Sequence, residues 1–124
     1  MADPEGLLER YRQLTSRLLS LAREGNRILI VTHIDADGLC SGSIVFAALM
    51  RKRANVTVRA LPDLDPKAIS DVAGQGYDFI IFTDLGSSLV QELDRALGAR
   101  HVIIDHHQLS AEDSGVNVLS VALM

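Results

Sequence analysis

Short apolar runs alternate with amphipathic segments along most of this chain. The runs over 28–32, 56–61, 79–83 and 101–104 predict strands, and a shorter one over 116–119 predicts a fifth. They are almost continuously apolar, as is typical of strands covered on both faces. Segments with helical periodicity separate them, so the pattern favours βαβ units and a parallel sheet.

The helical segments carry start and stop signals. Asp3 and Pro4 predict the start of a first amphipathic helix, and Gly25 predicts its end. Three further helices are expected: a buried one over 40–51 after a tight turn at Gly38, a short one over 67–73 capped by Asp65 and Pro66, and one that Ser87 or Ser88 caps and that ends at Leu97.

We therefore expect a three-layer α/β fold with helices on both faces of a parallel sheet of four to five strands. One domain over 1–124 suits the length, with the amphipathic helix over 1–25 and the α/β core over 27–124. The strand order 2-1-3-4-5 is expected because it brings the polar motifs described below to one edge. The sequence ends without a cap signal, which predicts a domain cut short.

Composition narrows the function classes. The net charge of −4 argues against a broad basic surface for nucleic acid, and 4% aromatic residues argue against a stacking platform for single strands. A single cysteine, Cys40, excludes an intrachain disulfide and fits a cytoplasmic location. The sequence shows neither a signal peptide nor an apolar run of the ~18 residues that a membrane span requires, so no membrane association is expected.

Acids and histidines follow three of the predicted strands. Carboxyl ends of parallel strands meet at one edge of a sheet, so these side chains are expected to converge there. Carboxylate oxygen and neutral imidazole together suit Mn²⁺, which predicts a two-metal site. The residues are His33, Asp35 and Asp37 after the first strand, Asp84 after the third, and Asp105, His106 and His107 after the fourth.

Simpler structural roles are also open to some of these residues. The acids over 35–38 also fit an ordinary Asp-Gly turn, and Asp84 also fits a helix cap, although the serines that follow already fill that role. The histidine pair at 106–107 is hard to account for by structure alone. His101, at the start of a strand, is assigned a structural or solvated position, and Cys40 is assigned to core packing.

Several well-known sites are excluded. The sequence contains no GxSxG nucleophile elbow, no GxGxxG dinucleotide loop and no P-loop. A calcium loop of the EF-hand type is excluded because the acidic spacing continues into a helix without the twelfth-position glutamate.

The three motifs in order resemble the DHH phosphoesterase superfamily. They are HIDADG over 33–38, Asp84 within TDLGSS, and DHHQ over 105–108. The chain is most similar to the RecJ-like branch, including archaeal RecJ-type nucleases associated with the GINS replication complex, and the similarity begins near Arg27. Type II inorganic pyrophosphatases resemble it less, because their first motif has more residues between the histidine and the first acid.

The resemblance implies a site for two Mn²⁺ ions, with Mg²⁺ as the alternative, and a role for each residue. The implied roles are a first ion held by His33 and Asp35, a second held by Asp37 and His106, a bridge from Asp84, His107 facing the scissile phosphate, and Asp105 orienting the histidines. The family's fourth-motif aspartate has no counterpart, since Glu112 and Asp113 lie too close to 105–107.

The function that the resemblance implies is a Mn²⁺-dependent phosphodiesterase, the DHH part of a RecJ-like single-strand-specific exonuclease in DNA repair or replication. Its partners would be single-stranded nucleic acid or a short oligonucleotide. Two alternatives stay open. One is a hydrolase of short oligonucleotides or cyclic dinucleotides with the same metal chemistry. The other is a non-catalytic replication scaffold that binds a GINS-type partner.

Overall fold

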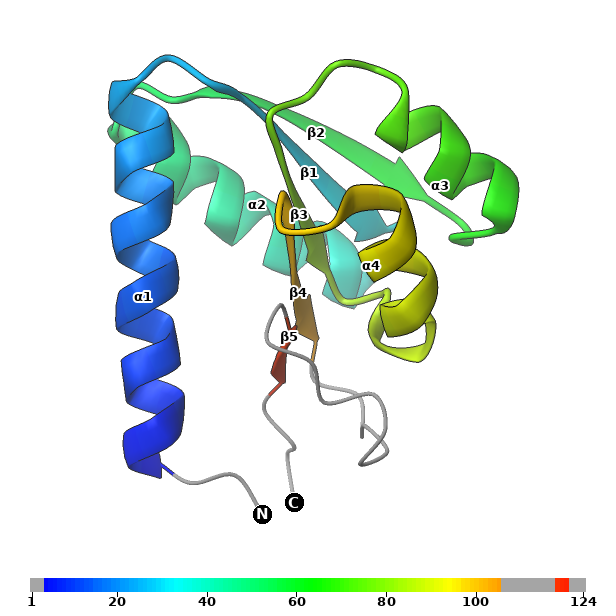
Figure 1. Ribbon diagram of the computed structural model, residues 1–124, viewed down its shortest axis with the longest axis horizontal. Coiled ribbons are helices and arrows are strands. Elements are labelled where there is room, and N and C mark those ends of the chain that lie inside the picture. Colours follow the sequence, from blue (N-terminus) through cyan, green and yellow to red (C-terminus); the bar gives the residue numbers. More distant parts are fainter. Residues whose placement is uncertain (1–3, 106–117, 121–124) are drawn as a thin grey trace.

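The computed structural model describes residues 4–105 and 118–120, which form a parallel sheet with helices on both faces (Figure 1). Within these residues the sheet has five strands in the order β2-β1-β3-β4-β5. The expected fold class, sheet polarity and strand order are confirmed. The strands are β1 (Arg27–His33), β2 (Asn55–Leu61), β3 (Phe79–Thr83), β4 (His101–Asp105) and β5 (Val118–Ser120).

The helices divide between the two faces of the sheet. Their bounds are α1 (Pro4–Arg23), α2 (Ala36–Arg51), α3 (Pro66–Ala73) and α4 (Val90–Leu97), and a 3-10 turn, η1 (Ser87–Leu89), precedes α4. Apolar residues of α1 and α2 pack on one face, and those of α3 and α4 on the other. Asp65 caps α3 as expected, because its side chain accepts a hydrogen bond from the Ala68 N–H at 2.8 Å.

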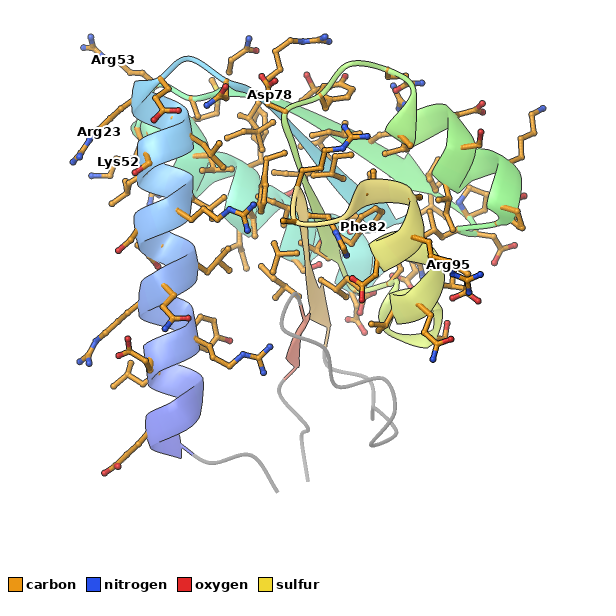
Figure 2. The ribbon with its side chains drawn as sticks, viewed as in Figure 1. Arg23, Lys52, Arg53, Asp78, Phe82 and Arg95 are labelled. Carbon is orange, nitrogen blue, oxygen red and sulfur yellow. The ribbon has the colours of Figure 1, made fainter. Side chains whose placement is uncertain are left out.

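Two apolar clusters cover the central strands. Alternate residues of β1 and β3 enter opposite clusters: Ile30 and Ile81 face α1 and α2, whereas Val31 and Phe82 face α3 and α4. Phe82 is fully buried and lies between the sheet and α4 (Figure 2). Burial on both faces explains why these strands are continuously apolar rather than alternating.

Helix α2 begins earlier than expected and is much less buried. It starts at Ala36 rather than at residue 40, because Asp35 caps it by accepting from the Gly38 N–H at 2.8 Å. Gly38 therefore lies in the first turn of the helix, not in a preceding tight turn. The expectations of a buried helix and a buried Cys40 are wrong: Cys40 is exposed and Ile44 is 71% exposed. Helix α2 lies in an outer layer, so only one of its sides packs on the sheet. The residues on its other side stay exposed even where they are apolar.

The serine cap expected for the last helix is also absent from the described structure. Both serines lie within η1, and the cap positions are filled by Gly86 before η1 and by Leu89 before α4. Gly86, with φ +100°, turns the chain, and its carbonyl accepts from the Leu89 N–H at 2.9 Å. A backbone hydrogen bond thus begins this segment in place of a side chain.

His101 is fully buried at the start of β4, so its role is structural rather than solvated. Its Nδ1 lies 2.7 Å from the Gly98 carbonyl, which only accepts, so Nδ1 carries the proton. Nε2 lies 3.4 Å from the Asp94 carboxylate without forming a hydrogen bond. Burial is the main reason that the pKa of His101 is lowered, and the ring is neutral in the folded chain at pH 7.

We predict that His101 makes the fold less stable in acid. The unfolded imidazole titrates near its ordinary pKa of about 6.5, and the folded one titrates lower. The unfolded chain therefore binds more protons as the pH falls from about 7.5 to about 5, and stability is lost. Urea unfolding across this range should show a steeper loss for the unaltered chain than for His101→Asn, in which the carboxylates are unchanged. Equal slopes would contradict the prediction.

A second prediction concerns Gly38. A Cβ at this position would lie 2.0 Å from the His33 carbonyl oxygen, a distance that backbone atoms cannot accommodate. Gly38→Ala should therefore lower the free energy of unfolding by more than about 2 kcal/mol, although alanine favours helices. The matched control is Gly74→Ala at the end of α3, where φ is −90° and the nearest atom is 3.4 Å away. It should change stability by less than about 1 kcal/mol in urea unfolding. A fully stable Gly38→Ala protein would show that the two segments lie further apart.

Candidate metal centre

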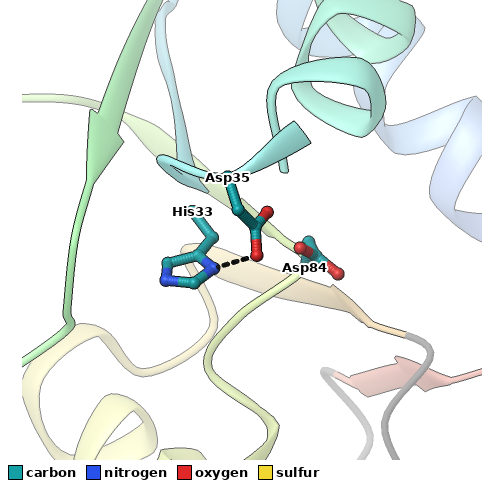
Figure 3. Close-up of side chains that lie close together, drawn as sticks. All are labelled: His33, Asp35 and Asp84. Carbon is teal, nitrogen blue, oxygen red and sulfur yellow. Dashed lines mark hydrogen bonds and ion pairs between the residues drawn. The ribbon is translucent and has the colours of Figure 1, made fainter. Parts of the chain in front are cut away.

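Three of the predicted ligands meet at the carboxyl ends of β1 and β3. These strands are parallel neighbours in the register Thr32↔Thr83, so His33 and Asp84 leave the sheet side by side. Ligand atoms of His33, Asp35 and Asp84 all lie within 4.8 Å of one another, and Figure 3 shows the three side chains pointing toward one space. Two carboxylates and one imidazole form a donor set that fits a divalent cation such as Mn²⁺.

His33 is held from two sides. Its Nε2 lies 2.9 Å from the Pro62 carbonyl, and its Nδ1 lies 2.7 Å from Asp35 Oδ2. The bond to Asp35 is the main reason that the pKa of His33 is raised. Because a carbonyl only accepts, Nε2 keeps its proton, and Nδ1 is the nitrogen that can lose its proton and bind a cation through its lone pair.

Asp35 has two tasks. One carboxylate oxygen accepts from the Gly38 N–H and caps α2, while the other faces His33. The Gly38 hydrogen bond is the largest cause of the lowered pKa of Asp35, and His33 adds to it. The carboxylate is therefore ionised at neutral pH, as a metal ligand must be.

Asp84 is the buried member of the group, with a relative exposure of 6%. Its φ of +60° is one that few residues other than glycine adopt, although aspartate and asparagine tolerate it best. Its N–H donates to the Ile104 carbonyl of β4 at 3.0 Å. The residue is not a helix cap. The turn at Asp84 instead directs its carboxylate toward Asp35 and His33 (Figure 3).

The structure does not join every predicted site residue to this group. Asp37 is exposed in the first turn of α2 and is not one of the three clustered residues. Asp105 ends β4, the strand next to β3, so its backbone reaches the same edge. The side chain of Asp105 and the whole of His106 and His107 lie outside the described residues. Their assigned roles stay predictions.

Two contributors to the site were not predicted. The Pro62 carbonyl, which orients His33, follows β2 and carries no sequence signal, because any residue supplies a carbonyl. Thr32 is a buried hydroxyl residue at the end of an otherwise apolar run. A polar residue within a buried, otherwise apolar strand is the sequence signal that could have identified it.

Among the residues that the structure describes, no helix is long and apolar enough to cross a membrane.

Known proteins resemble the chain in sequence and in structure. An uncharacterized protein of Methanocaldococcus jannaschii is 31% identical over 93 residues, which are 73% of this chain and 21% of that protein. The crystal structure of RecJ from Thermus thermophilus in complex with Mn²⁺ superposes with a TM-score of 0.76 at 23% identity, covering 90% of this chain and 17% of that one. A crystal structure of exonuclease RecJ bound to manganese also gives a TM-score of 0.76, at 22% identity, covering 88% of this chain and 30% of that one.

The chain thus spans about a fifth of its curated relative and less than a third of either RecJ chain. The structural likeness establishes a shared fold. The pattern of the family described as "DHH family, N-terminal domain" matches residues 27–122, which is most of the sequence and includes all three motifs. The chain therefore belongs to the DHH family.

Proposed function

We propose that this chain is the metal-binding part of a Mn²⁺-dependent phosphodiesterase of the RecJ type, a single-strand-specific exonuclease of DNA repair or replication in the cytoplasm. The observation that carries the proposal is the convergence of His33, Asp35 and Asp84 at the strand edge of a DHH-family fold. Two solved relatives with this fold are RecJ proteins bound to manganese, which supports the choice of metal.

The clustered residues fit one ion, and the family motifs add ligands for a second. In the proposal His33 and Asp35 would hold the first ion, Asp37 and His106 would hold the second, and Asp84 would serve both. The imidazoles favour Mn²⁺ over Mg²⁺, which prefers an all-oxygen shell. Two such ions supply Lewis-acid activation of water and stabilise the oxygens of an in-line displacement at phosphorus.

The chain's own residues prepare the site before substrate arrives. The Pro62 carbonyl orients the His33 ring, and the Gly38 N–H orients the Asp35 carboxylate, so both groups would be in place for a cation once the proton between them is lost. Burial of Asp84 strengthens its interaction with a cation, because the local dielectric is low. His107 is proposed to face the scissile phosphate, and Asp105 to orient the histidines.

The proposed substrate is single-stranded nucleic acid or a short oligonucleotide. With a net charge of −4, the attraction for phosphate has to come from the bound ions and from local groups rather than from overall charge. A GINS-type partner stays a prediction from the family resemblance. Co-purification of such a protein with a chain that takes up no metal would favour the scaffold alternative.

We predict that Asp84→Asn removes metal-dependent hydrolysis. Asparagine keeps the shape and tolerates the positive φ, so the change deletes a charged oxygen ligand and little else. Mn²⁺ affinity, measured by calorimetry on the metal-free chain, should fall at least about tenfold. Cleavage of bis-p-nitrophenyl phosphate and of end-labelled single strands should fall further. The matched control is Asp71→Asn, an exposed acid of α3, which should bind and cleave as the unaltered chain does.

The same assay separates the candidate functions. Release of mononucleotides from long single strands supports the exonuclease, whereas cleavage confined to dinucleotides or cyclic dinucleotides supports the small-substrate hydrolase. Mn²⁺ uptake and hydrolysis by Asp84→Asn equal to those of the unaltered chain would refute the proposed site.

A further inference from the structure

Two buried threonines face each other beneath the start of α2. Thr32 and Thr83 are register partners at the carboxyl ends of β1 and β3, and both are almost completely inaccessible to solvent. Each lies two residues after a strand residue that faces α1 and α2, Ile30 or Ile81, so by the alternation of side chains along a strand both enter the layer under α2. The residue after each threonine, His33 or Asp84, is one of the three clustered candidate ligands.

The Thr32 hydroxyl contacts both segments that carry the clustered acids. Its Oγ1 lies 2.6 Å from the Gly38 carbonyl in the first turn of α2 and 3.2 Å from the Thr83 carbonyl on β3. A hydroxyl has one proton, and the shorter distance directs it to Gly38. Ser41 Oγ also donates to that carbonyl at 3.1 Å, but Ser41 is part of the same helix and cannot tie it to the sheet.

Each of these two carbonyls belongs to a backbone segment that positions a candidate metal ligand. The Gly38 residue whose carbonyl Thr32 holds also donates its N–H to the Asp35 carboxylate. The Thr83 carbonyl belongs to the peptide unit that leads into Asp84, and the N–H of that same unit donates to Ile104. One side chain therefore contacts the backbone that orients Asp35 and the backbone that orients Asp84.

The packing around Thr32 is close. A Cβ on Gly42, one helical turn beyond Gly38, would lie 3.0 Å from Thr32 Cγ2 and 3.4 Å from its hydroxyl oxygen. Glycine at this position lets α2 approach the strand near enough for the hydroxyl to reach Gly38. The Thr83 hydroxyl, in contrast, has no hydrogen-bond partner among the described residues. The two threonines are thus both buried but differ in hydrogen bonding, which makes Thr83 a control for Thr32.

We propose that Thr32 is a positioning residue that tunes the metal affinity of the site. Its hydroxyl holds the start of α2, where Asp35 lies, and its strand is paired with β3, which leads into Asp84. The inference rests on the proposed function, because it concerns the same metal site. The Thr32 hydroxyl does not bind the ion. Its effect arises because ligands that are already correctly spaced need no rearrangement on binding.

The test compares Mn²⁺ dissociation constants of four forms of the 124-residue chain, measured by calorimetry under conditions where circular dichroism shows each to be folded. Thr32→Val keeps the shape and removes the hydroxyl, and should weaken binding about tenfold or more. Thr32→Ser keeps the hydroxyl and should bind within about threefold of the unaltered chain. Thr83→Val removes the unpartnered hydroxyl and should bind unchanged.

The outcomes separate the proposal from a purely structural role. Equal affinity of Thr32→Val and the unaltered chain overturns the positioning role, even if the variant is less stable. Thr32→Ser as weak as Thr32→Val also overturns it, because packing and not the hydroxyl is then responsible. Failure of the unaltered chain to bind Mn²⁺ overturns the proposed function itself, and the inference with it.

One further variant decides the question if Thr32→Val does not fold. Gly42→Ala leaves the Thr32 hydroxyl in place, favours the helix, and pushes against the Thr32 side chain. It should bind Mn²⁺ severalfold more weakly under conditions where circular dichroism shows it to be folded. Unchanged affinity in Gly42→Ala, together with an unfolded Thr32→Val, rejects the proposal.

Discussion

The parallel pairing of β1 with β3 is the contact on which the rest of this structure depends. The chain leaves β1 through α2, forms β2 on one side, and then crosses back through α3 to place β3 on the other side. Because such crossovers are right-handed, reversing direction in the sheet puts the two helices on opposite faces. The gap between the diverging connections lies beyond the carboxyl ends of β1 and β3, where ligands of open α/β sheets bind. The three clustered ligands occupy that place.

The same edge carries features that a fold selected only for stability would avoid. Asp84 combines a positive φ with burial of a carboxylate. Asp35 lies at the positive N-terminal end of α2, and this end of the helix stabilises the ionised carboxylate. The same positive end partly cancels the attraction of the carboxylate for a cation. Strain and buried charge of this kind cluster at functional sites, where the surroundings hold them in place. Here the holding groups are backbone atoms and one threonine hydroxyl.

The family and the geometry support different parts of the functional conclusion. Membership of the DHH family rests on the sequence match over 27–122, and the shared fold rests on the RecJ superpositions. The cluster of His33, Asp35 and Asp84 rests on distances within this chain alone. The comparisons therefore give the family and the fold, and the distances bring three candidate ligands together at one strand edge.

The sequence by itself determined the strands, their polarity and the edge at which the site forms. Continuous apolar runs such as 79–83 encode burial on both faces locally, and acids just after such runs have to emerge at the carboxyl edge. Only the tertiary structure decided that α2 begins at Ala36 with most of its surface exposed, that the Pro62 carbonyl orients His33, and that the Thr32 hydroxyl reaches the Gly38 carbonyl. These three features depend either on contacts between segments that are distant in sequence or on which side of a helix packs on the sheet. The spacing of apolar residues along the chain predicts neither the contacts between distant segments nor the packed side of a helix, because both are set only when the chain folds.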